Sequence, residues 1–205
     1  ADGAGGHGGG EIASARVVDA LRTLPVGLAS GELLARTRGA LEQANAALRA
    51  EARARGAGAL LASTVVVLMV RGGHFACLWA GDSRCYLWRG GLLTRLTRDH
   101  SMVQELLDAG ALTEEHAARH PHANVVTRAV GADETLVLDK VTGQVQPGDL
   151  FLLASDGVCK DLGDAAIAAT LIGGGEGQGL ADSLIALAMS AGSTDNVTVV
   201  LVRCG

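Results

Sequence analysis

Four aspartates share one kind of setting in this 205-residue sequence. Each lies beside glycine or asparagine, where an apolar segment or a glycine-rich stretch begins or ends: Asp2, Asp82, Asp156 and Asp195. Any one of them alone is most simply a turn residue. Four that pointed into one cleft would repel one another unless cations neutralised them. Oxygen ligands favour Mg²⁺ or Mn²⁺ over zinc or copper, and two such ions ~3.5–4 Å apart promote the hydrolysis of phosphate esters.

The first eleven residues hold one of these aspartates, His7 and six glycines. Glycine at this density lets the backbone approach another group closely and adopt positive φ. Asp2 can supply a hard oxygen ligand, and no side chain shields the Gly3 carbonyl. Taken alone, the segment is more simply a linker or a frayed terminus. The three later aspartates favour a ligand-binding loop instead.

Composition indicates a folded globular protein, because 48% of the residues are hydrophobic and only 19% are charged. The net charge of −5, without a basic tract, argues against nucleic acid or an anionic membrane as partner. No apolar run is long enough to insert into a membrane. The four cysteines lack zinc-site spacing, and we expect a cytoplasmic protein with reduced thiols.

The hydrophobic patterns predict helices first, then an antiparallel meander with short glycine turns, then mixed elements. We expect helices over residues 12–24, 30–55, 100–110, 164–171 and 180–191, a short helix from 113, and strands over 63–70, 74–80, 84–88, 92–96, 135–145, 150–154 and 197–202. This order suggests an α+β fold in which sheet packs on sheet and helices cover the outside.

Three histidines close in sequence form a second candidate metal site: His116, His120 and His122. A histidine cluster could bind a transition metal. With Pro121 among them and no cysteine partner, the cluster is more simply an exposed loop.

The motifs together resemble one family. In chain order they are Asp2-Gly3-Ala4-Gly5-Gly6-His7 with Glu11 and Ala13-Ser14, Ser63-Thr64, Gly81-Asp82-Ser83-Arg84, Leu96 to Ser101, Thr127 to Gly131, Ser155-Asp156-Gly157 and Asp195-Asn196-Val197-Thr198. The chain resembles the bacterial PP2C-type (PPM) metal-dependent protein serine/threonine phosphatases over nearly its whole length. Within that family it is most similar to the small phosphatases encoded with type VI secretion systems.

The resemblance implies a fold and a set of metal ligands. The fold would be a four-layer α-β-β-α sandwich of two mainly antiparallel sheets with helices outside. Asp2 would bridge two metal ions, and the Gly3 carbonyl would contribute to the second ion. Asp156 and Asp195 would hold the first ion. Asp82, together with Asp156, matches the carboxylates that bind a third, weaker ion. The metal would be Mn²⁺ or Mg²⁺.

The implied reaction is direct attack of metal-activated water on phosphoserine or phosphothreonine, with no phosphoenzyme. Asp2, His7 and Asp156 are the catalytic candidates; His7 either protonates the leaving alkoxide or makes a structural hydrogen bond. Residues 101–124 correspond to a flap beside the cleft that is thought to influence substrate choice. The implied partner is a phosphoprotein, with a secretion-system scaffold protein as one candidate, and we expect a monomer.

Two departures from the family pattern leave alternatives open. Ala4 stands where bacterial relatives have methionine. The sequence also begins at the motif, although relatives carry preceding strands that supply a phosphate-binding arginine and another acidic ligand. We therefore expect one domain over residues 1–205 without its N-terminal strands, with Ala1 as the first retained residue of a longer protein; if the strands are truly absent, we expect activity to be lost. A non-catalytic metal-binding regulatory module, an inactive fragment, or a phosphatase acting on an anti-sigma-factor antagonist are the rival interpretations.

Overall fold

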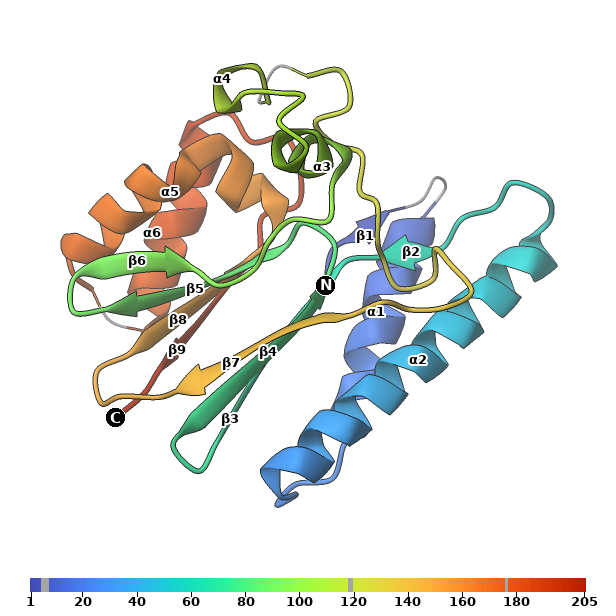
Figure 1. The fold of residues 1–205 in the computed structure, drawn as a ribbon, viewed down its shortest axis with the longest axis horizontal. Helices are drawn as coiled ribbons and strands as arrows, with labels where there is room; N and C mark the ends of the chain where they lie inside the picture. The colour runs from blue at the N-terminus through green and yellow to red at the C-terminus, as the bar shows by residue number, and fades with distance from the viewer. Residues whose placement is uncertain (5–7, 118–119, 176) are drawn as a thin grey trace.

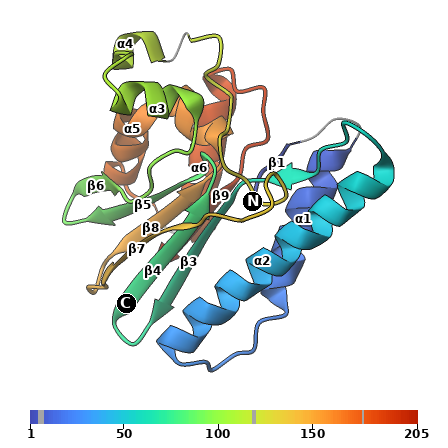
Figure 2. The ribbon, with the colours of Figure 1, turned by 45° about the vertical axis from the view of Figure 1, so that its right-hand side comes forward.

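Two facing β-sheets form the centre of the molecule and helices cover both outer sides (Figure 1). The computed structural model describes residues 1–4, 8–117, 120–175 and 177–205. α1 and α2 lie beside the first sheet, and α5 and α6 lie beside the second (Figure 2). The predicted α-β-β-α sandwich is confirmed.

The first sheet contains β3 (Val65–Arg71), β4 (His74–Ala80) and β7 (Asp139–Gln144) in the order β3-β4-β7. The second contains β6 (Leu92–Arg95), β5 (Arg84–Arg89), β8 (Leu150–Ala154) and β9 (Val199–Arg203) in the order β6-β5-β8-β9. Every pairing is antiparallel, as the short links predicted. A separate short pair, β1 (Gly3–Ala4) with β2 (Ala62–Ser63), lies next to α1.

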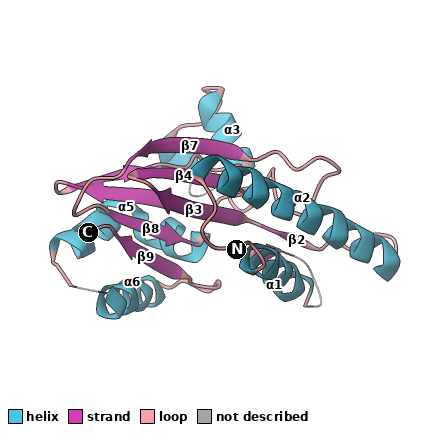
Figure 3. Cartoon of the chain, turned by 90° about the horizontal axis from the view of Figure 1, so that it is seen from below, coloured by secondary structure: helices cyan, strands magenta, loops and turns pink. Residues whose placement is uncertain are grey.

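The outer helices are α1 (Gly9–Arg22) and α2 (Ser30–Arg55) on one side, and α5 (Asp156–Ile172) and α6 (Gly177–Ser190) on the other (Figure 3). α2 buries Leu41, Leu48 and Ala52, whose spacing places them on one face of the helix. Two short helices, α3 (Met102–Asp108) and α4 (Glu114–Ala117), lie within the predicted flap. Among the described residues, no helix combines the length and hydrophobicity that crossing a bilayer requires.

Aromatic residues are scarce, so a few rings fill the space between the sheets. Phe75 of β4 meets Phe151 of β8 edge to face, with ring centroids 5.0 Å apart. Cys77, Trp79 and Cys85 belong to the same buried cluster. This shared core joins the two sheets.

Most predicted helices and strands begin and end within three residues of the observed ones, but three of the predictions were wrong. The strand predicted over 63–70 is interrupted at Thr64, whose backbone pairs with Asp2. The strand predicted over 135–145 extends only from Asp139 to Gln144. The helix predicted from residue 164 begins at Asp156, and it continues past a kink at Gly163, where φ is 70°.

Candidate functional site

Asp2 is fixed through its backbone. Its amide donates to Thr64 Oγ1 at 3.1 Å, and its carbonyl accepts from the Thr64 amide at 2.8 Å. The Ser63 hydroxyl donates to the same carbonyl at 3.0 Å. Ser63 and Thr64 thereby hold Asp2 at the point where the chain enters the first sheet.

The same threonine connects Asp2 to the turn that carries Asp82. Thr64 Oγ1 lies 2.7 Å from Ser83 Oγ in a buried hydrogen bond. Gly81 has φ of 115°, and a Cβ there would lie 2.6 Å from Thr64 Cβ. Only glycine allows this close approach without rearrangement. The β4–β5 turn is thus held against Thr64, with Asp82 buried beside it.

A second set of contacts brings the Asp195 loop to the start of α5. Ser155 Oγ donates to the Asn196 carbonyl at 2.9 Å and accepts from the Thr198 amide at 3.0 Å. A Cβ on Gly157 would lie 2.8 Å from the Asn196 carbonyl oxygen. The small residue therefore lets the loop before β9 pack against the N-terminus of α5, which places Asp195 near Asp156.

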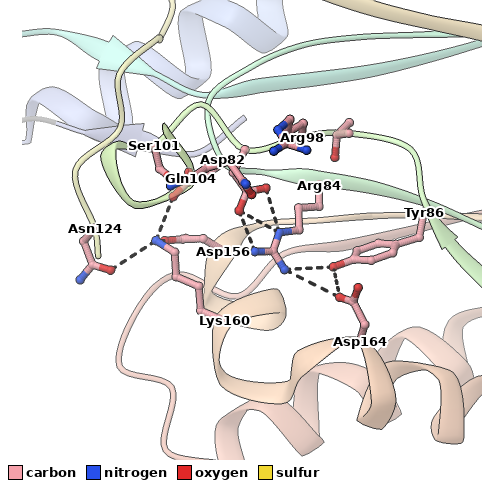
Figure 4. A network of polar contacts seen from close by, with 12 residues as sticks. Asp82, Arg84, Tyr86, Arg98, Ser101, Gln104, Asn124, Asp156, Lys160 and Asp164 are labelled. Carbon is pink, nitrogen blue, oxygen red and sulfur yellow. Dashed lines mark hydrogen bonds and ion pairs between the residues drawn. The ribbon is translucent and has the colours of Figure 1, made fainter. Parts of the chain in front are cut away.

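α5 is anchored from the side of the second sheet by an ion-pair network (Figure 4). Arg84 of β5 donates to Asp99 through Nε and through Nη2, the latter at 2.7 Å. Tyr86 accepts from Arg84 at 3.2 Å and donates to Asp164 of α5 at 2.8 Å. This network attaches α5 to the sheet at Asp164, just after the kink at Gly163.

The Asp2 carboxyl lies close enough to the carboxylates of Asp156 and Asp195 to feel both charges. The pKa of Asp2 is raised to about 7, first by burial, then by the charge of Asp156 and a hydrogen bond between the two carboxyl groups, and then by the charge of Asp195. Among the described residues, no three acidic, histidine or cysteine side chains already surround one point at ligand distance. The donors are nevertheless the hard oxygens that Mg²⁺ and Mn²⁺ select, and a cation would relieve their repulsion.

Asp82 does not face an open carboxylate cluster, because Lys160 lies between it and Asp156 (Figure 4). The Lys160 ammonium donates to one oxygen of each carboxylate at 2.8 Å. Burial raises the pKa of Asp82, and Lys160 limits that rise. Burial alone would lower the pKa of Lys160, but the two carboxylates more than offset it and the pKa is raised. Sequence reasoning missed Lys160, although its i,i+4 spacing from Asp156 in a helix would have indicated the pair.

A polar cleft of about 420 Å³ opens beside Asp2, and its lining includes Gly3, Glu11 and Asn196. Glu11, which belongs to the first family motif, adds an acidic group to this lining. The Gly3 carbonyl oxygen faces the start of α1, where a Cβ on Gly10 would lie 2.4 Å from it. An apolar hollow of about 380 Å³ between α2 and the first sheet has no acidic residue in its lining and is separate from this chemistry.

The histidines divide into two cases. His7 lies outside the described residues, so its predicted role stays a prediction. In the cluster, His116 lies in α4 and is exposed, whereas His120, which is half-buried, and His122, which is exposed, lie in the loop that follows, as predicted for those two. His116 Nδ1 is engaged with Thr113 Oγ1 at 2.7 Å.

The sequence model for protein phosphatase 2C matches residues 1–195. The chain belongs to the protein phosphatase 2C family. It is 36% identical to the serine/threonine protein phosphatase PstP of Mycobacterium tuberculosis over 207 residues, which covers 98% of this chain but only 39% of that protein. The chain thus spans about two fifths of that relative's length. The predicted family is confirmed.

Two solved structures extend the comparison. PppA, described as a key regulatory component of T6SS in Pseudomonas aeruginosa, is 42% identical with a TM-score of 0.89, over 98% of this chain and 83% of that one. The PstP catalytic domain in complex with two manganese ions is 34% identical with a TM-score of 0.86, over 97% and 83%. The likeness to PppA supports the narrower resemblance to the type VI secretion group.

Proposed function

We propose that residues 1–205 form one metal-dependent phosphatase unit that hydrolyses phosphoserine and phosphothreonine in proteins. The observation that carries this proposal is the environment of Asp2, where burial and then the charges of Asp156 and Asp195 raise the pKa to about 7. Neighbouring ionised carboxylates repel one another, and a bound cation would relieve this repulsion. Family membership and the two manganese ions in the PstP catalytic domain support the same chemistry.

In the proposed mechanism Asp2, the Gly3 carbonyl, Asp156 and Asp195 hold two Mn²⁺ or Mg²⁺ ions. When bound, the ions supply a water activated for attack on phosphorus and screen the phosphate charge. Contacts within the chain position the ligands before an ion binds. Thr64 holds the backbone of Asp2, and Ser155 holds the loop of Asn196 against the start of α5. Such positioning favours a defined geometry for the reactants.

The attack breaks the phosphorus–oxygen ester bond, and the departing seryl or threonyl oxygen takes up a proton. We propose His7 as the donor of that proton. A cysteine nucleophile is not supported, because Cys159 is buried and burial raises the pKa of its thiol to about 12. Cys77 and Cys85 are buried between the sheets.

We further propose a phosphoprotein of a type VI secretion system as the substrate, on the strength of the likeness to PppA. The α3–α4 segment, which corresponds to the predicted flap, would contact that substrate. A panel of phosphoserine, phosphothreonine and phosphotyrosine peptides tests the substrate class. Release of phosphate from phosphotyrosine peptides alone would contradict it.

The direct test compares Asp156→Asn with Asp161→Asn. Both remove one carboxylate from α5, but Asp161 is exposed one helical turn away from the site. We expect Asp156→Asn to lower Mn²⁺-dependent hydrolysis of p-nitrophenyl phosphate by at least ~10²-fold, because charge stabilisation at the reacting phosphate is lost. Asp161→Asn should retain the wild-type rate.

Circular dichroism of both variants shows whether the fold is retained. Mn²⁺ binding without turnover in the unmodified protein would favour the regulatory-module interpretation instead. Equal rates in the two variants would remove Asp156 from the catalytic site.

A further inference from the structure

The ammonium of Lys160 is surrounded by three oxygen acceptors. It donates to Asp82 Oδ2 and to Asp156 Oδ2 at 2.8 Å each, and to Asn124 Oδ1 at 3.3 Å (Figure 4). A lysine ammonium has three N–H donors, so these contacts use all of them. Lys160 follows Asp156 by one turn of α5, which places both side chains on the same face of the helix.

The two carboxylates are well removed from water. The Asp82 side chain is only 4% exposed and that of Asp156 only 16%. Carboxylates in such positions need a positive partner, and the chain supplies one itself. Two carboxylates and an amide oxygen are also the ligands that a divalent ion would take. An ion bridging Asp82 and Asp156 would therefore compete with Lys160 for the same oxygens and would meet its positive charge.

We propose that Lys160 is a built-in cation that takes the place of a third divalent ion between Asp82 and Asp156. The protein then binds two ions rather than three, and Asp82 acts as the partner of Lys160 rather than as a metal ligand. This departs from the third ion that the family resemblance implied, and it rests on the two-ion site proposed above.

The arrangement also gives Lys160 a positioning role. One oxygen of Asp156 is held by the ammonium, which leaves the other oxygen for an ion of the two-ion site. The contact with Asn124 ties the end of the 101–124 segment to α5 without a metal. Attachment of this segment should therefore be independent of the divalent-ion concentration.

The sequence offers a matched control, because it contains only two lysines, Lys140 and Lys160. Lys140 lies on β7 and is exposed. Lys160→Met and Lys140→Met each remove one positive charge and keep a long unbranched side chain. The number of Mn²⁺ ions bound at saturation is measured by equilibrium dialysis with elemental analysis, and by electron paramagnetic resonance of free Mn²⁺.

We expect two ions in the unmodified protein and in Lys140→Met, and three in Lys160→Met. The third ion should be lost again in Lys160→Met combined with Asp82→Asn. Two ions in a folded Lys160→Met protein would overturn the proposal, as would three ions in the unmodified protein. Absence of Mn²⁺ binding in every variant would overturn the two-ion site as well, so the two failures are distinguishable.

A second measurement follows Lys160 itself and therefore does not require the Lys160→Met variant to fold. Protein labelled with ¹³C and ¹⁵N in lysine gives two side-chain signals, which Lys140→Met assigns. During a titration with diamagnetic Mg²⁺ to saturation, the Lys160 signal should keep a chemical shift distinct from that of the exposed Lys140. Convergence of the two signals at saturation would show that an ion displaces the ammonium, and would overturn the proposal.

Discussion

Asp2 shows at the residue scale how tertiary structure changes the chemistry of one side chain. In an unfolded chain its carboxyl would ionise near its ordinary pKa of 3.8, whereas folding raises that pKa to about 7. The shift arises from burial and from the neighbouring charges of Asp156 and Asp195. The residue that sequence reasoning placed at the centre of the site is therefore also the one whose ionisation opposes folding.

A pH prediction follows for metal-free protein. Between about pH 4 and pH 7 the folded chain binds more protons at Asp2 than the unfolded chain does, so this group's contribution to stability falls as pH rises through that window. We expect the melting temperature in EDTA to fall over this range, with an effect reduced by the partial exposure of Asp2. Differential scanning calorimetry of wild type and Asp2→Asn measures it.

The Asp2→Asn variant has no titrating group at position 2. The part of the fall in melting temperature with pH that Asp2 causes should therefore be absent in this variant. Saturating Mn²⁺ should raise the melting temperature most at the upper end of the range, since the ion binds the ionised carboxylate. An unchanged slope in the Asp2→Asn variant would show that other groups cause the dependence.

At the element scale, the decisive contact is between the start of α5 and the loop before β9. It relies on Gly157, because a Cβ there would lie 2.8 Å from the Asn196 carbonyl oxygen. The Ser193 hydroxyl also donates to the Gly157 carbonyl at 2.8 Å. No helical pattern in the sequence indicates this packing, which depends on two segments about forty residues apart.

Gly157→Ala should lower the unfolding free energy by about 1–3 kcal/mol, because the added methyl group overfills the contact. It should also weaken Mn²⁺ binding by displacing Asp195 from Asp156. Gly39→Ala is the control: Gly39 lies inside α2 with open space around it, and the change should stabilise by about 0.5–1 kcal/mol. Urea denaturation and Mn²⁺ titration measure both effects. Wild-type Mn²⁺ affinity in Gly157→Ala would contradict the positioning argument.

At the scale of the whole molecule, the two sheets depend on one shared core. Phe75 and Phe151 pack edge to face across it, and Phe151 is fully buried. Because the chain has so few aromatic residues, no other large ring is at hand to fill the space that Phe75 or Phe151 occupies. We infer that the two sheets fold as one cooperative unit. The aspartates that follow strands of different sheets then keep fixed positions relative to one another.

Phe151→Ala should lower the unfolding free energy by about 3–5 kcal/mol, because it leaves a cavity between the sheets. The two tryptophans report on one sheet each, since Trp79 lies on β4 and Trp88 on β5. Urea unfolding of Trp79→Phe and Trp88→Phe proteins, followed by fluorescence, should give coincident transitions. Separate midpoints would show that the sheets unfold independently.

The sequence by itself determined the local features of this protein. Short apolar runs and short glycine turns predicted the antiparallel strands, and the glycine or asparagine beside each aspartate marked Asp2, Asp82, Asp156 and Asp195 as candidates. These features are readable because they depend on neighbours within a few residues.

Only the tertiary structure decided which charges meet. Lys160 contacts Asp82 from 78 residues further along the chain, and Thr64 holds Asp2 across 62 residues. The i,i+4 spacing relates Lys160 to Asp156, but the contact with Asp82 depends on how the strands pair and the helices pack, and no local pattern encodes it. For this reason the sequence did not indicate that Lys160 would lie 2.8 Å from Asp82, at the position where the family resemblance implied a third ion.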